Sequence, residues 1–487
     1  MTRTITIDPL TRIEGHPRIT LQLDAAGQIA EARFHVLEFR GFEAFCVGRP
    51  FTEMAALTAR ICGICPVSHQ LAAARTGDKL LAVQPPPAAQ RLRRLLNLAQ
   101  ICQSHALSFF YLSSPDFLLG WECEPARRNL FGLMAADPDL ARAGIGLRQF
   151  GQQVLEHLGG RRIHASWPLP GGVRSALSAS TRDWILAQLP QARTTAALAL
   201  DRFKGLLDGP LQREQRSFGD FASLFLALVA PDGRWSCSDG ALRVVDSAGA
   251  IVADGLSEDD YAAVLGEVVE PWSYLKSPYY KPLGYPAGLY RVGPLARLNV
   301  CERIGTPWAD AELAQWRSRS GTARSGGRIV TSSFAYHHAR LVEIVACLEG
   351  IEQLLADDAL LQGPVRSHGS LSALEAVGVS EAPRGTLFHH YRVDPDGLIA
   401  KVNLIIATGQ NNLAMNRTIS QIAREWIPTP VPEGVEIPEP LLNRVEAGIR
   451  CFDPCLSCST HAAGTMPLLI QLRDAAGQLL AERRRDG

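Results

Sequence analysis

Three observations predict a predominantly helical α+β fold for this chain of 487 residues. Apolar and polar residues alternate over the first forty positions, which is the period of half-buried strands. From about residue 50 the apolar residues recur three and four positions apart, which is the period of amphipathic helices. No linker rich in glycine, serine or proline divides the chain, so we expect one compact body with several layers.

The clearest predicted elements lie in the first quarter of the chain. Strands are expected at 4–7, 19–23 and 29–36, and the turn DAAGQ separates the last two. A helix is expected at 92–110, because its apolar residues follow the i, i+3, i+4, i+7 spacing of one buried face: Leu92, Leu95, Leu96, Ala99, Cys102, Ala106, Phe109 and Phe110.

The rest of the chain gives weaker patterns. Short apolar runs separated by turn residues predict a hairpin at 230–255, and the proline-rich stretch 268–300 is typical of an irregular loop. Helical spacing returns at 335–357 and 410–426. The final residues, 466–487, are expected to form a strand, a second DAAGQ turn and a charged strand.

The composition excludes several classes of protein. Lysine plus arginine and aspartate plus glutamate both number 49, so no excess charge favours binding to nucleic acid or to an anionic membrane. We expect neither a secretory signal nor a membrane span, because the sequence contains no apolar run of about 18 residues. Eleven cysteines spread over a long chain predict free thiols in a reducing cytoplasm rather than a disulfide framework.

The most informative motifs are two short cysteine pairs. Cys62 and Cys65 lie in RICGICPVSH, Cys455 and Cys458 lie in DPCLSCSTH, and a histidine follows each pair closely. A zinc ribbon closes its loop over about 15–20 residues, because its metal holds a small fold together. Here most of the chain lies between the pairs. The spacing therefore favours a site assembled for chemistry over one that stabilises the fold.

Thiolates select soft metals, namely zinc, nickel, copper(I) or iron. A structural zinc ion held by all four cysteines remains an alternative on spacing alone. Arg60 and Asp453, charged residues beside the two pairs, favour a reactive centre, because buried charges are costly unless they have a partner or a role.

Together with RIEGH at 12–16 and APRG at 382–385, the two cysteine motifs resemble those of [NiFe]-hydrogenase large subunits over essentially the whole chain. Further stretches are most similar to the soluble, bidirectional NAD-reducing type: EFRGFE, WSYLKSPYYKPLG, RVGPLARLNV, EAPRGTLFHHY and TGQNN. The resemblance implies a central bundle of long helices with small peripheral sheets. It also implies reversible heterolytic cleavage of H2.

The resemblance assigns a role to each sulfur. Cys62 and Cys455 would bind nickel terminally, and Cys65 and Cys458 would bridge nickel to an iron that carries carbonyl and cyanide ligands. The other residues that it places around this centre are Pro383 and Arg384 beside the small ligands, Thr408 on a cyanide, and His69 and His105 near the bridging sulfurs. For His105 the alternative is a core histidine on a helix face with its hydrogen bonds satisfied.

A second metal and a proton route are implied in the same way. Glu43, His461 and the backbone carbonyl of Leu404 would hold magnesium, which prefers oxygen ligands. The first proton acceptor is either Cys455 or Arg384.

The next proton relay would be Glu14, since a carboxyl group can both accept and donate. For Glu14 the alternative is a structural ion pair with Arg12 or another cation. Asp116 and Asp453 would pair with Arg384 and hold its guanidinium.

Electrons would leave through other chains. The remaining cysteines are scattered and no GxGxxG fingerprint is present, so the expected partners are a small subunit with iron–sulfur clusters and a diaphorase that binds FMN and NAD.

Nickel-insertion chaperones and a maturation endopeptidase are also implied. The endopeptidase would remove residues 462–487 from the body formed by 1–461, freeing the carboxylate of His461 and letting the second cysteine pair become buried.

Three other functions remain as alternatives. A hydrogenase linked to NADP or to a deazaflavin would share these motifs. A four-cysteine zinc protein would bind zinc and have no redox activity. A quinone-reductase subunit of related fold is disfavoured, because such subunits lack the thiolates that this chain retains.

Overall fold

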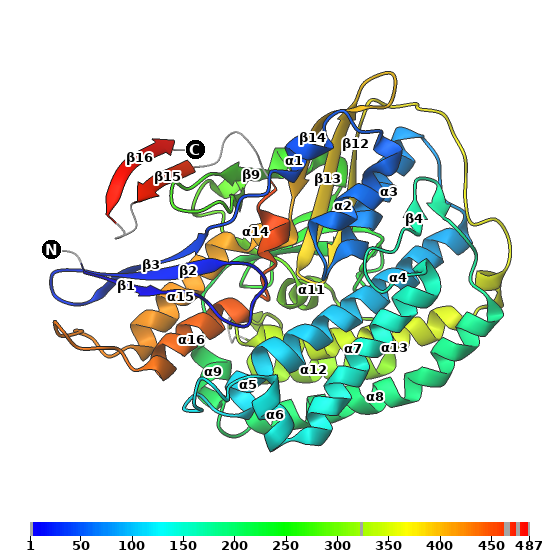
Figure 1. The fold of residues 1–487 in the computed structure, drawn as a ribbon. Helices are drawn as coiled ribbons and strands as arrows, with labels where there is room; N and C mark the ends of the chain where they lie inside the picture. Colours follow the sequence, from blue (N-terminus) through cyan, green and yellow to red (C-terminus); the bar gives the residue numbers. More distant parts are fainter. Residues whose placement is uncertain (1–2, 322–324, 462–467, 474–477, 486–487) are drawn as a thin grey trace.

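In the computed structural model, which describes residues 3–321, 325–461, 468–473 and 478–485, the first three strands form an antiparallel sheet (Figure 1). The strands are β1 (Arg3–Ile7), β2 (Pro17–Leu23) and β3 (Ile29–Val36). In this register Ile19 lies opposite Phe34, and both are buried. The predicted alternation is confirmed, because the apolar face packs inward against helix α15 (Asn412–Trp426).

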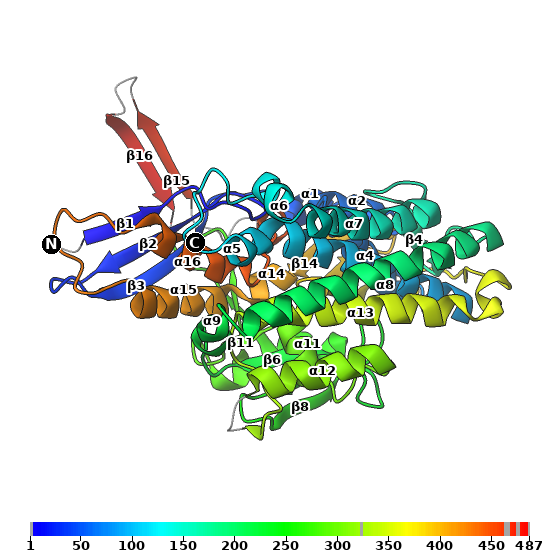
Figure 2. The ribbon, with the colours of Figure 1, turned by 90° about the horizontal axis from the view of Figure 1, so that it is seen from below.

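Four long helices form the centre of the molecule: α4 (Pro87–Ala106), α7 (Pro138–Gly159), α8 (Ala179–Leu207) and α13 (Ala335–Leu355). Each packs against the next, and α13 packs back against α4, so the four enclose one core (Figure 2). All eight residues of the apolar face predicted at 92–110 are buried. The helix continues beyond Ala106 as a π-helical turn over Leu107–Ser113.

A three-stranded antiparallel sheet lies against α3 (Pro66–Leu80). Its strands are β12 (Glu375–Ala382), β13 (Gly385–Val393) and β14 (Ile399–Ile405). Ala382 pairs with Gly385, so Pro383 and Arg384 form the two-residue tip of the β12–β13 hairpin. Gly385 has a φ of 137°, and an added Cβ would lie 2.3 Å from Val292, which requires glycine there.

A second sheet contains the predicted hairpin at 230–255. In the order β11-β6-β7-β8, it joins β6 (Leu224–Val229), β7 (Ala241–Val245), β8 (Ile251–Leu256) and β11 (Tyr290–Arg291). Short pairs are formed by β9 (Leu265–Val268) with β10 (Ser277–Tyr280), and by β4 (Pro168–Leu169) with β5 (Gly172–Val173).

The prediction of an irregular loop at 268–300 is wrong in part. This stretch contains β10, β11 and the buried helix α11 (Pro294–Val300). Pro294 occupies the first turn of α11, where a backbone N–H has no helical partner, so this proline starts a helix instead of preventing one.

The helices predicted at 335–357 and 410–426 are confirmed as α13 and as α14 (Ala407–Gln410) followed by α15. The remaining helices are α1 (Phe42–Cys46), α2 (Met54–Thr58), α5 (Ser114–Leu118), α6 (Leu130–Ala136), α9 (Gln212–Ser217), α10 (Tyr261–Val264), α12 (Pro307–Ser320), α16 (Glu439–Arg450) and α17 (Leu456–Ser459).

The two ends of the described chain contain strands, as expected. The last described residues pair as β15 (Leu468–Arg473) and β16 (Leu479–Arg485), while the second DAAGQ turn lies largely outside the described residues. No helix in the described part of the chain is both long enough and apolar enough to cross a bilayer.

Candidate metal centre

The two cysteine pairs meet at the starts of two helices. Cys65 precedes α3, which Pro66 begins, and Cys455 precedes the short helix α17, which contains Cys458. A parallel bridge between Glu14 and Cys455 brings the second pair against the N-terminal segment. The tertiary fold therefore joins residues from both ends of the sequence at one point.

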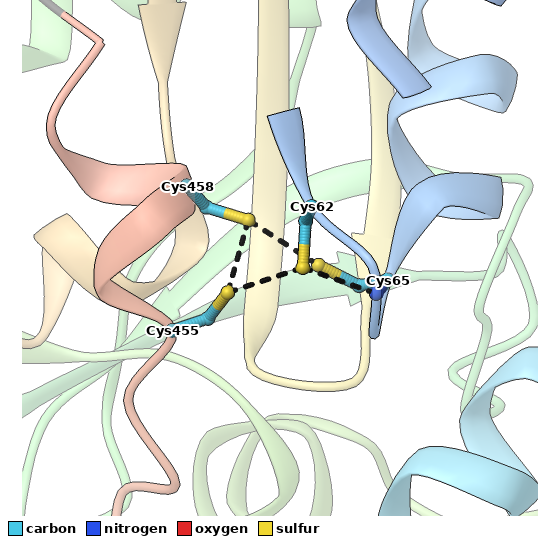
Figure 3. A group of neighbouring side chains, drawn as sticks. All are labelled: Cys62, Cys65, Cys455 and Cys458. Atoms are coloured by element: carbon cyan, nitrogen blue, oxygen red, sulfur yellow. Dashed lines mark hydrogen bonds between the residues drawn. The ribbon is translucent and has the colours of Figure 1, made fainter. Parts of the chain in front are cut away.

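The four sulfurs form one compact group (Figure 3). The Sγ atoms of Cys62 and Cys455 are 3.2 Å apart, those of Cys65 and Cys458 are 3.4 Å apart, and those of Cys455 and Cys458 are 3.1 Å apart. All four lie within 4.8 Å of one another, all are buried, and none is in a disulfide. The arrangement offers four thiolates to metal ions in a site closed to water.

Local hydrogen bonds favour negative charge on the sulfur of Cys62. The backbone N–H groups of Ile64 and Cys65 donate to the Sγ of Cys62 at 3.1 and 3.3 Å. The thiols of Cys455 and Cys458 also hydrogen-bond to Cys62 and lower its pKa, whereas burial raises the pKa of Cys458. Metal ions would supply the positive charge that allows all four to ionise.

Arg384 reaches the sulfurs from the tip of the β12–β13 hairpin. Its Nη2 lies 2.9 Å from Oδ2 of Asp453, and its Nε donates to the backbone oxygen of Asp453. Burial lowers the pKa of Arg384, but Asp453 and the neighbouring sulfurs outweigh it and hold the pKa well above its ordinary value. Arg384 is therefore a fixed positive charge beside the cluster, and its predicted pairing with Asp453 is found.

A small cavity adjoins the sulfurs, with a volume of about 10 Å³, roughly what one water needs. Its lining includes the following residues: Cys65, His69, Ala382, Arg384, Leu387, Ile406, Ala407, Thr408, Cys455 and Cys458. The hydroxyl of Thr408 accepts the backbone N–H of Cys455 at 3.0 Å. His69 Nε2 lies 3.5 Å from Sγ of Cys458. Thr408, His69 and Arg384 thus line one cavity with the sulfurs, and Pro383 forms the hairpin tip with Arg384.

Glu14 lies directly behind the second cysteine pair. Its carboxylate accepts the backbone N–H of Ser457 at 3.0 Å and also the hydroxyl of Ser457. Its side chain forms no ion pair with any described residue, so pairing with Arg12 is not its role; Arg12 pairs with Asp116 instead. Glu14 is half-buried, which places a carboxyl group between the sulfur cluster and the outside.

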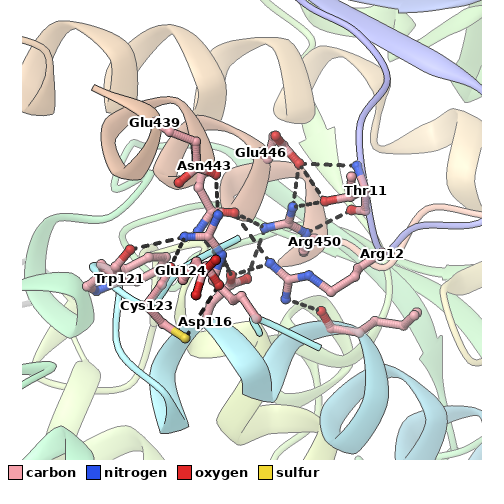
Figure 4. Close-up of polar contacts among 12 residues, drawn as sticks. Thr11, Arg12, Asp116, Trp121, Cys123, Glu124, Glu439, Asn443, Glu446 and Arg450 are labelled. Atoms are coloured by element: carbon pink, nitrogen blue, oxygen red, sulfur yellow. Dashed lines mark hydrogen bonds and ion pairs between the residues drawn. The ribbon is translucent and has the colours of Figure 1, made fainter. Parts of the chain in front are cut away.

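The prediction that Asp116 holds Arg384 is wrong (Figure 4). Because α5 directs Asp116 towards α16, its carboxylate accepts from Arg450 Nη1 and Asn443 Nδ2, each at 3.0 Å, and pairs with Arg12. Burial raises the pKa of Asp116, but Arg450 and Arg12 outweigh it and lower the pKa. Asp116 therefore joins the N-terminal segment to α16.

The prediction that His105 lies near the bridging sulfurs is also not supported. His105 lies on the side of α4 that packs against α13, and its Nε2 is 2.8 Å from Oε2 of Glu343. Glu343 also accepts from Trp235 and from Arg297. His105 is thus a hydrogen-bonded core residue.

The three residues of the predicted magnesium site contact one another, although Leu404 does so through its backbone N–H and not through the predicted carbonyl. Glu43 Oε1 lies 2.9 Å from Nδ1 of His461 and accepts the backbone N–H of Leu404 at 2.8 Å. The backbone N–H of Glu43 in turn donates to the carbonyl of His461 at 3.0 Å. Glu43 therefore links the start of α1 to His461.

Comparison with known proteins agrees with this geometry. The family described as "Nickel-dependent hydrogenase" matches residues 40–122 and 245–461, and the "HoxL-like" family matches residues 4–39. This chain belongs to the nickel-dependent hydrogenases. Among curated hydrogenases, it is 40% identical to "NAD-reducing hydrogenase HoxS subunit beta" of Cupriavidus necator, over the full length of both chains. It is 38% identical to a chain of the F420-non-reducing hydrogenase of Methanothermobacter thermautotrophicus, covering 98% of this chain and 99% of that one.

Solved hydrogenase structures confirm the predicted fold. An NAD+-reducing [NiFe]-hydrogenase in its H2-reduced state has a TM-score of 0.89 and 46% identity, covering 94% of this chain and 100% of that chain. A Ni-Fe-Se hydrogenase from D. vulgaris Hildenborough, at 22% identity and a TM-score of 0.74, shares the fold. The predicted α+β large-subunit fold with a central helix bundle is therefore confirmed.

The donor set of this hydrogenase fits nickel and iron. Four thiolates suit soft transition metals, whereas magnesium and calcium prefer oxygen. Beside them, Arg384 Nη2 and Asp453 Oδ2 are buried, and neither makes an aligned hydrogen bond to any described residue, although they form an ion pair. Arg384 lines the small cavity, so its N–H without an aligned partner is a donor that acceptor ligands on the metals would satisfy.

The sequence patterns did not predict three residues that lie near the centre of this hydrogenase. Ser104 lies 3.5 Å from Nη1 of Arg384, and His389 and Tyr391 continue the contacts of His69. His389 and Tyr391 are two positions apart within FHHY, so a strand assignment would have placed them on one face. Ser104 gave no sequence signal.

The expectation that the second cysteine pair becomes buried only after removal of the C-terminal segment is not supported. Cys455 is 0% and Cys458 2% exposed in a chain that still contains residues 462–487. Their burial comes from the surrounding core, where they pack with Leu404 and Ala382.

Proposed function

We propose that this hydrogenase chain is the catalytic subunit of a complex that cleaves H2 reversibly and transfers the electrons to NAD+. The observation that carries the proposal is the buried group of four cysteines beside the cation of Arg384. The relative from Cupriavidus necator, named as a subunit of an NAD-reducing hydrogenase, supports the acceptor. A chain linked to NADP or a deazaflavin remains the alternative and is not favoured over it.

In this proposal the four sulfurs hold two metals. Cys62 and Cys455 would hold nickel, and Cys65 and Cys458 would be shared between nickel and an iron that carries carbonyl and cyanide ligands. When bound, the metals supply the redox chemistry that separates H2 into protons and electrons. The chain supplies the closed cavity, and Thr408 supports the cyanide assignment, because its hydroxyl proton has no acceptor among the described residues.

The chain also supplies the proton route. Arg384 is a poor base, because Asp453 and the sulfurs stabilise its charged form. We therefore assign first proton acceptance to Cys455, with Arg384 stabilising the charge that develops during cleavage. Glu14 accepts the proton next, since it contacts Ser457 in the turn that joins Cys455 to Cys458. Asp453 holds Arg384 in place.

We further propose that Glu43, His461 and the carbonyl of Leu404 bind magnesium. Carboxylate and carbonyl oxygens suit this ion, and water molecules would complete its shell. The hydrogen bond from His461 to Glu43 brings two of the ligands together.

The partners in this proposal are a small subunit with iron–sulfur clusters and a diaphorase that binds FMN and NAD. We place the complex in the cytoplasm, because none of the eleven cysteines is in a disulfide, as is usual in a reducing compartment. Nickel-insertion chaperones and an endopeptidase complete the centre. The endopeptidase removes 462–487, which the family match ending at residue 461 supports.

The decisive experiment produces the chain with its partner subunits and measures four properties of the purified complex. These are the nickel and iron content, the infrared bands of metal-bound carbonyl and cyanide, H2-dependent reduction of NAD+, and the intact mass of this chain. Removing one sulfur with Cys458→Ala should abolish the bands and the activity. Cys46→Ala, a buried thiol in the same core that is outside the cluster, should retain both.

Zinc at the site without infrared bands would reject the hydrogenase proposal in favour of a structural site. Reduction of NADP+ or a deazaflavin in place of NAD+ would reject NAD+ as the acceptor and leave the hydrogenase proposal standing. An active enzyme that retains Gly487 would reject removal of the C-terminal segment.

A further inference from the structure

A line of hydrogen bonds runs from Cys458 into the core. His69 Nε2 lies 3.5 Å from Sγ of Cys458, His69 Nδ1 lies 3.1 Å from His389 Nε2, and His389 Nδ1 lies 2.5 Å from the hydroxyl of Tyr391. No exposed fraction along this line exceeds 2%. Both ring nitrogens of both histidines are thereby used.

The backbone holds this line in a fixed geometry. His389 and Tyr391 are two positions apart on β13, so their side chains share the face that packs against α3, which carries His69. The carbonyl of His389 also accepts the hydroxyl of Thr76 on α3, at 3.1 Å. The helix and the strand therefore fix the spacing of the two imidazoles independently of any metal.

The direction of the hydrogen bonds follows from the sulfur end. A metal-bound thiolate has no proton to donate, so His69 must present its Nε2–H to Cys458. Its Nδ1 then accepts from Nε2–H of His389, and Nδ1 of His389 accepts from the hydroxyl of Tyr391. The reverse order, with Nδ1 of His389 donating to Tyr391, would leave two unprotonated nitrogens, His69 Nδ1 and His389 Nε2, facing each other at 3.1 Å.

We propose that His389 and Tyr391 are positioning residues that hold His69 in its Nε2–H tautomer, so that a fixed N–H donor faces the sulfur of Cys458. The N–H···S contact withdraws electron density from this sulfur and thereby tunes the metals that it bridges. The proposal rests on the proposed function only in that Cys458 is a metal-bound thiolate.

The first test does not depend on hydrogenase activity. The full-length chain is loaded with Zn²⁺, which also binds as a tetrathiolate complex and is compatible with magnetic resonance. Nitrogen-15 spectra of ring-labelled histidine then report each tautomer, and loss of a signal in His69→Gln and His389→Gln assigns the two residues. The proposal expects Nε2–H at both. An Nδ1–H tautomer at either residue overturns it.

The second test uses the complete, metal-loaded complex. Tyr391→Phe removes the outer donor of the line. The matched control is Tyr261→Phe, since the hydroxyl of Tyr261 lies 2.9 Å from Nδ1 of His390, the next residue of the same strand. We expect Tyr391→Phe to move the carbonyl and cyanide bands to lower frequency, because the bridging sulfur becomes more electron-rich. Tyr261→Phe should leave them in place.

Unchanged carbonyl and cyanide frequencies in both variants, or the same frequency shift in both, overturn the proposal. Absence of the bands from the unmodified complex would instead refute the proposed function, and the zinc experiment then decides this inference by itself.

Discussion

Nη2 of Arg384 lies 2.9 Å from Oδ2 of Asp453, and both side chains are at most 3% exposed. The contact is an ion pair without hydrogen-bond alignment, because neither atom has an aligned partner among the described residues. Asp453 precedes the second cysteine pair by two positions, and Arg384 forms the tip of the β12–β13 hairpin. The pair therefore fixes a cation in the lining of the cavity that adjoins the sulfurs.

Replacing Arg384 with lysine, a shorter cation, should distinguish the role of its charge from the role of its hydrogen-bond geometry. Arg384→Lys retains a positive charge but cannot contact both the carbonyl and the carboxylate of Asp453. We expect H2 turnover per nickel to fall by roughly 100-fold, the effect of losing one preorganised donor. Nickel analysis beside the turnover assay checks that the metal remains.

The matched control for this variant is Arg93→Lys. Arg93 forms a buried ion pair with Asp78 at 2.6 Å, away from the cysteines. Arg93→Lys should lower the stability of the chain and leave H2 turnover per nickel unchanged. Equal turnover in the Arg384 variant and the unmodified enzyme would remove Arg384 from the chemistry.

Glu14→Gln should block proton transfer while preserving the local structure. Glutamine can still accept the backbone N–H of Ser457, but it carries no titratable proton. We expect H2 turnover to fall by roughly 100-fold or more, as for loss of a general acid–base group. The infrared bands and the nickel content should stay unchanged.

Glu38→Gln is the control variant, since Glu38 is a carboxylate of the same N-terminal segment and pairs with the exposed His16. Substantial turnover retained in Glu14→Gln would assign the relay to another group.

Arg297→Met should destabilise the fold and loosen the Pro383–Arg384 tip. Arg297 is fully buried, pairs with Glu343 and Glu381, and donates to the carbonyl of Pro383 at 3.2 Å. Its loss leaves two carboxylates without their cation, which costs about 3–5 kcal/mol. Denaturant unfolding measures the loss of stability.

The same variant should incorporate less nickel, because the hairpin tip loses an anchor. The exposed ion pair of Arg91 with Asp357 supplies the control, and Arg91→Met should change neither quantity appreciably. An Arg297 variant as stable as the unmodified chain would show that the carboxylates find other partners.

His338→Leu should stabilise the chain, most of all in acid. Both ring nitrogens of His338 are buried without a hydrogen-bond partner among the described residues. Burial lowers the pKa of His338 to about 3, with Lys204 and Arg319 adding to the effect. The unfolded chain binds this proton near pH 6.5 and the folded chain does not, so stability falls as the pH drops below 6.5 towards 3.

Unfolding in urea at pH 7 and pH 5 checks this prediction. Between pH 7 and pH 5, the free energy of unfolding of the unmodified chain should fall by up to about 2 kcal/mol more than that of the variant. This figure follows because each pH unit below 6.5 costs about 1.36 kcal/mol. Identical pH dependence in the two proteins would show that His338 is protonated in the fold or has a partner.

Local patterns predicted the elements whose apolar residues follow a regular spacing. The alternation of β2 and the helical spacing along α4 were read from neighbouring positions in the sequence, and the apolar residues that they mark are buried. The helix α11 was missed, because proline was taken as an irregular-loop signal where it starts a buried helix. The strand β13 was missed, because it is buried on both faces and lacks alternation.

The sequence by itself determined the chemistry of the centre. Two CxxC motifs fix the identity and number of the soft ligands, and this information is local to each motif. The motif RIEGH likewise identified Glu14, and APRG identified Arg384.

Only the tertiary structure decided which residues surround that centre. The family resemblance placed Asp116 beside Arg384 and His105 near the bridging sulfurs, yet α5 directs Asp116 to Arg12 and Arg450, and α4 directs His105 to Glu343. In their places the fold brings Ser104 to Arg384, and His389 to His69. The reason is physical: a ligand motif is set by bonds along the chain, whereas the neighbours of a buried group are set by how helices and strands pack.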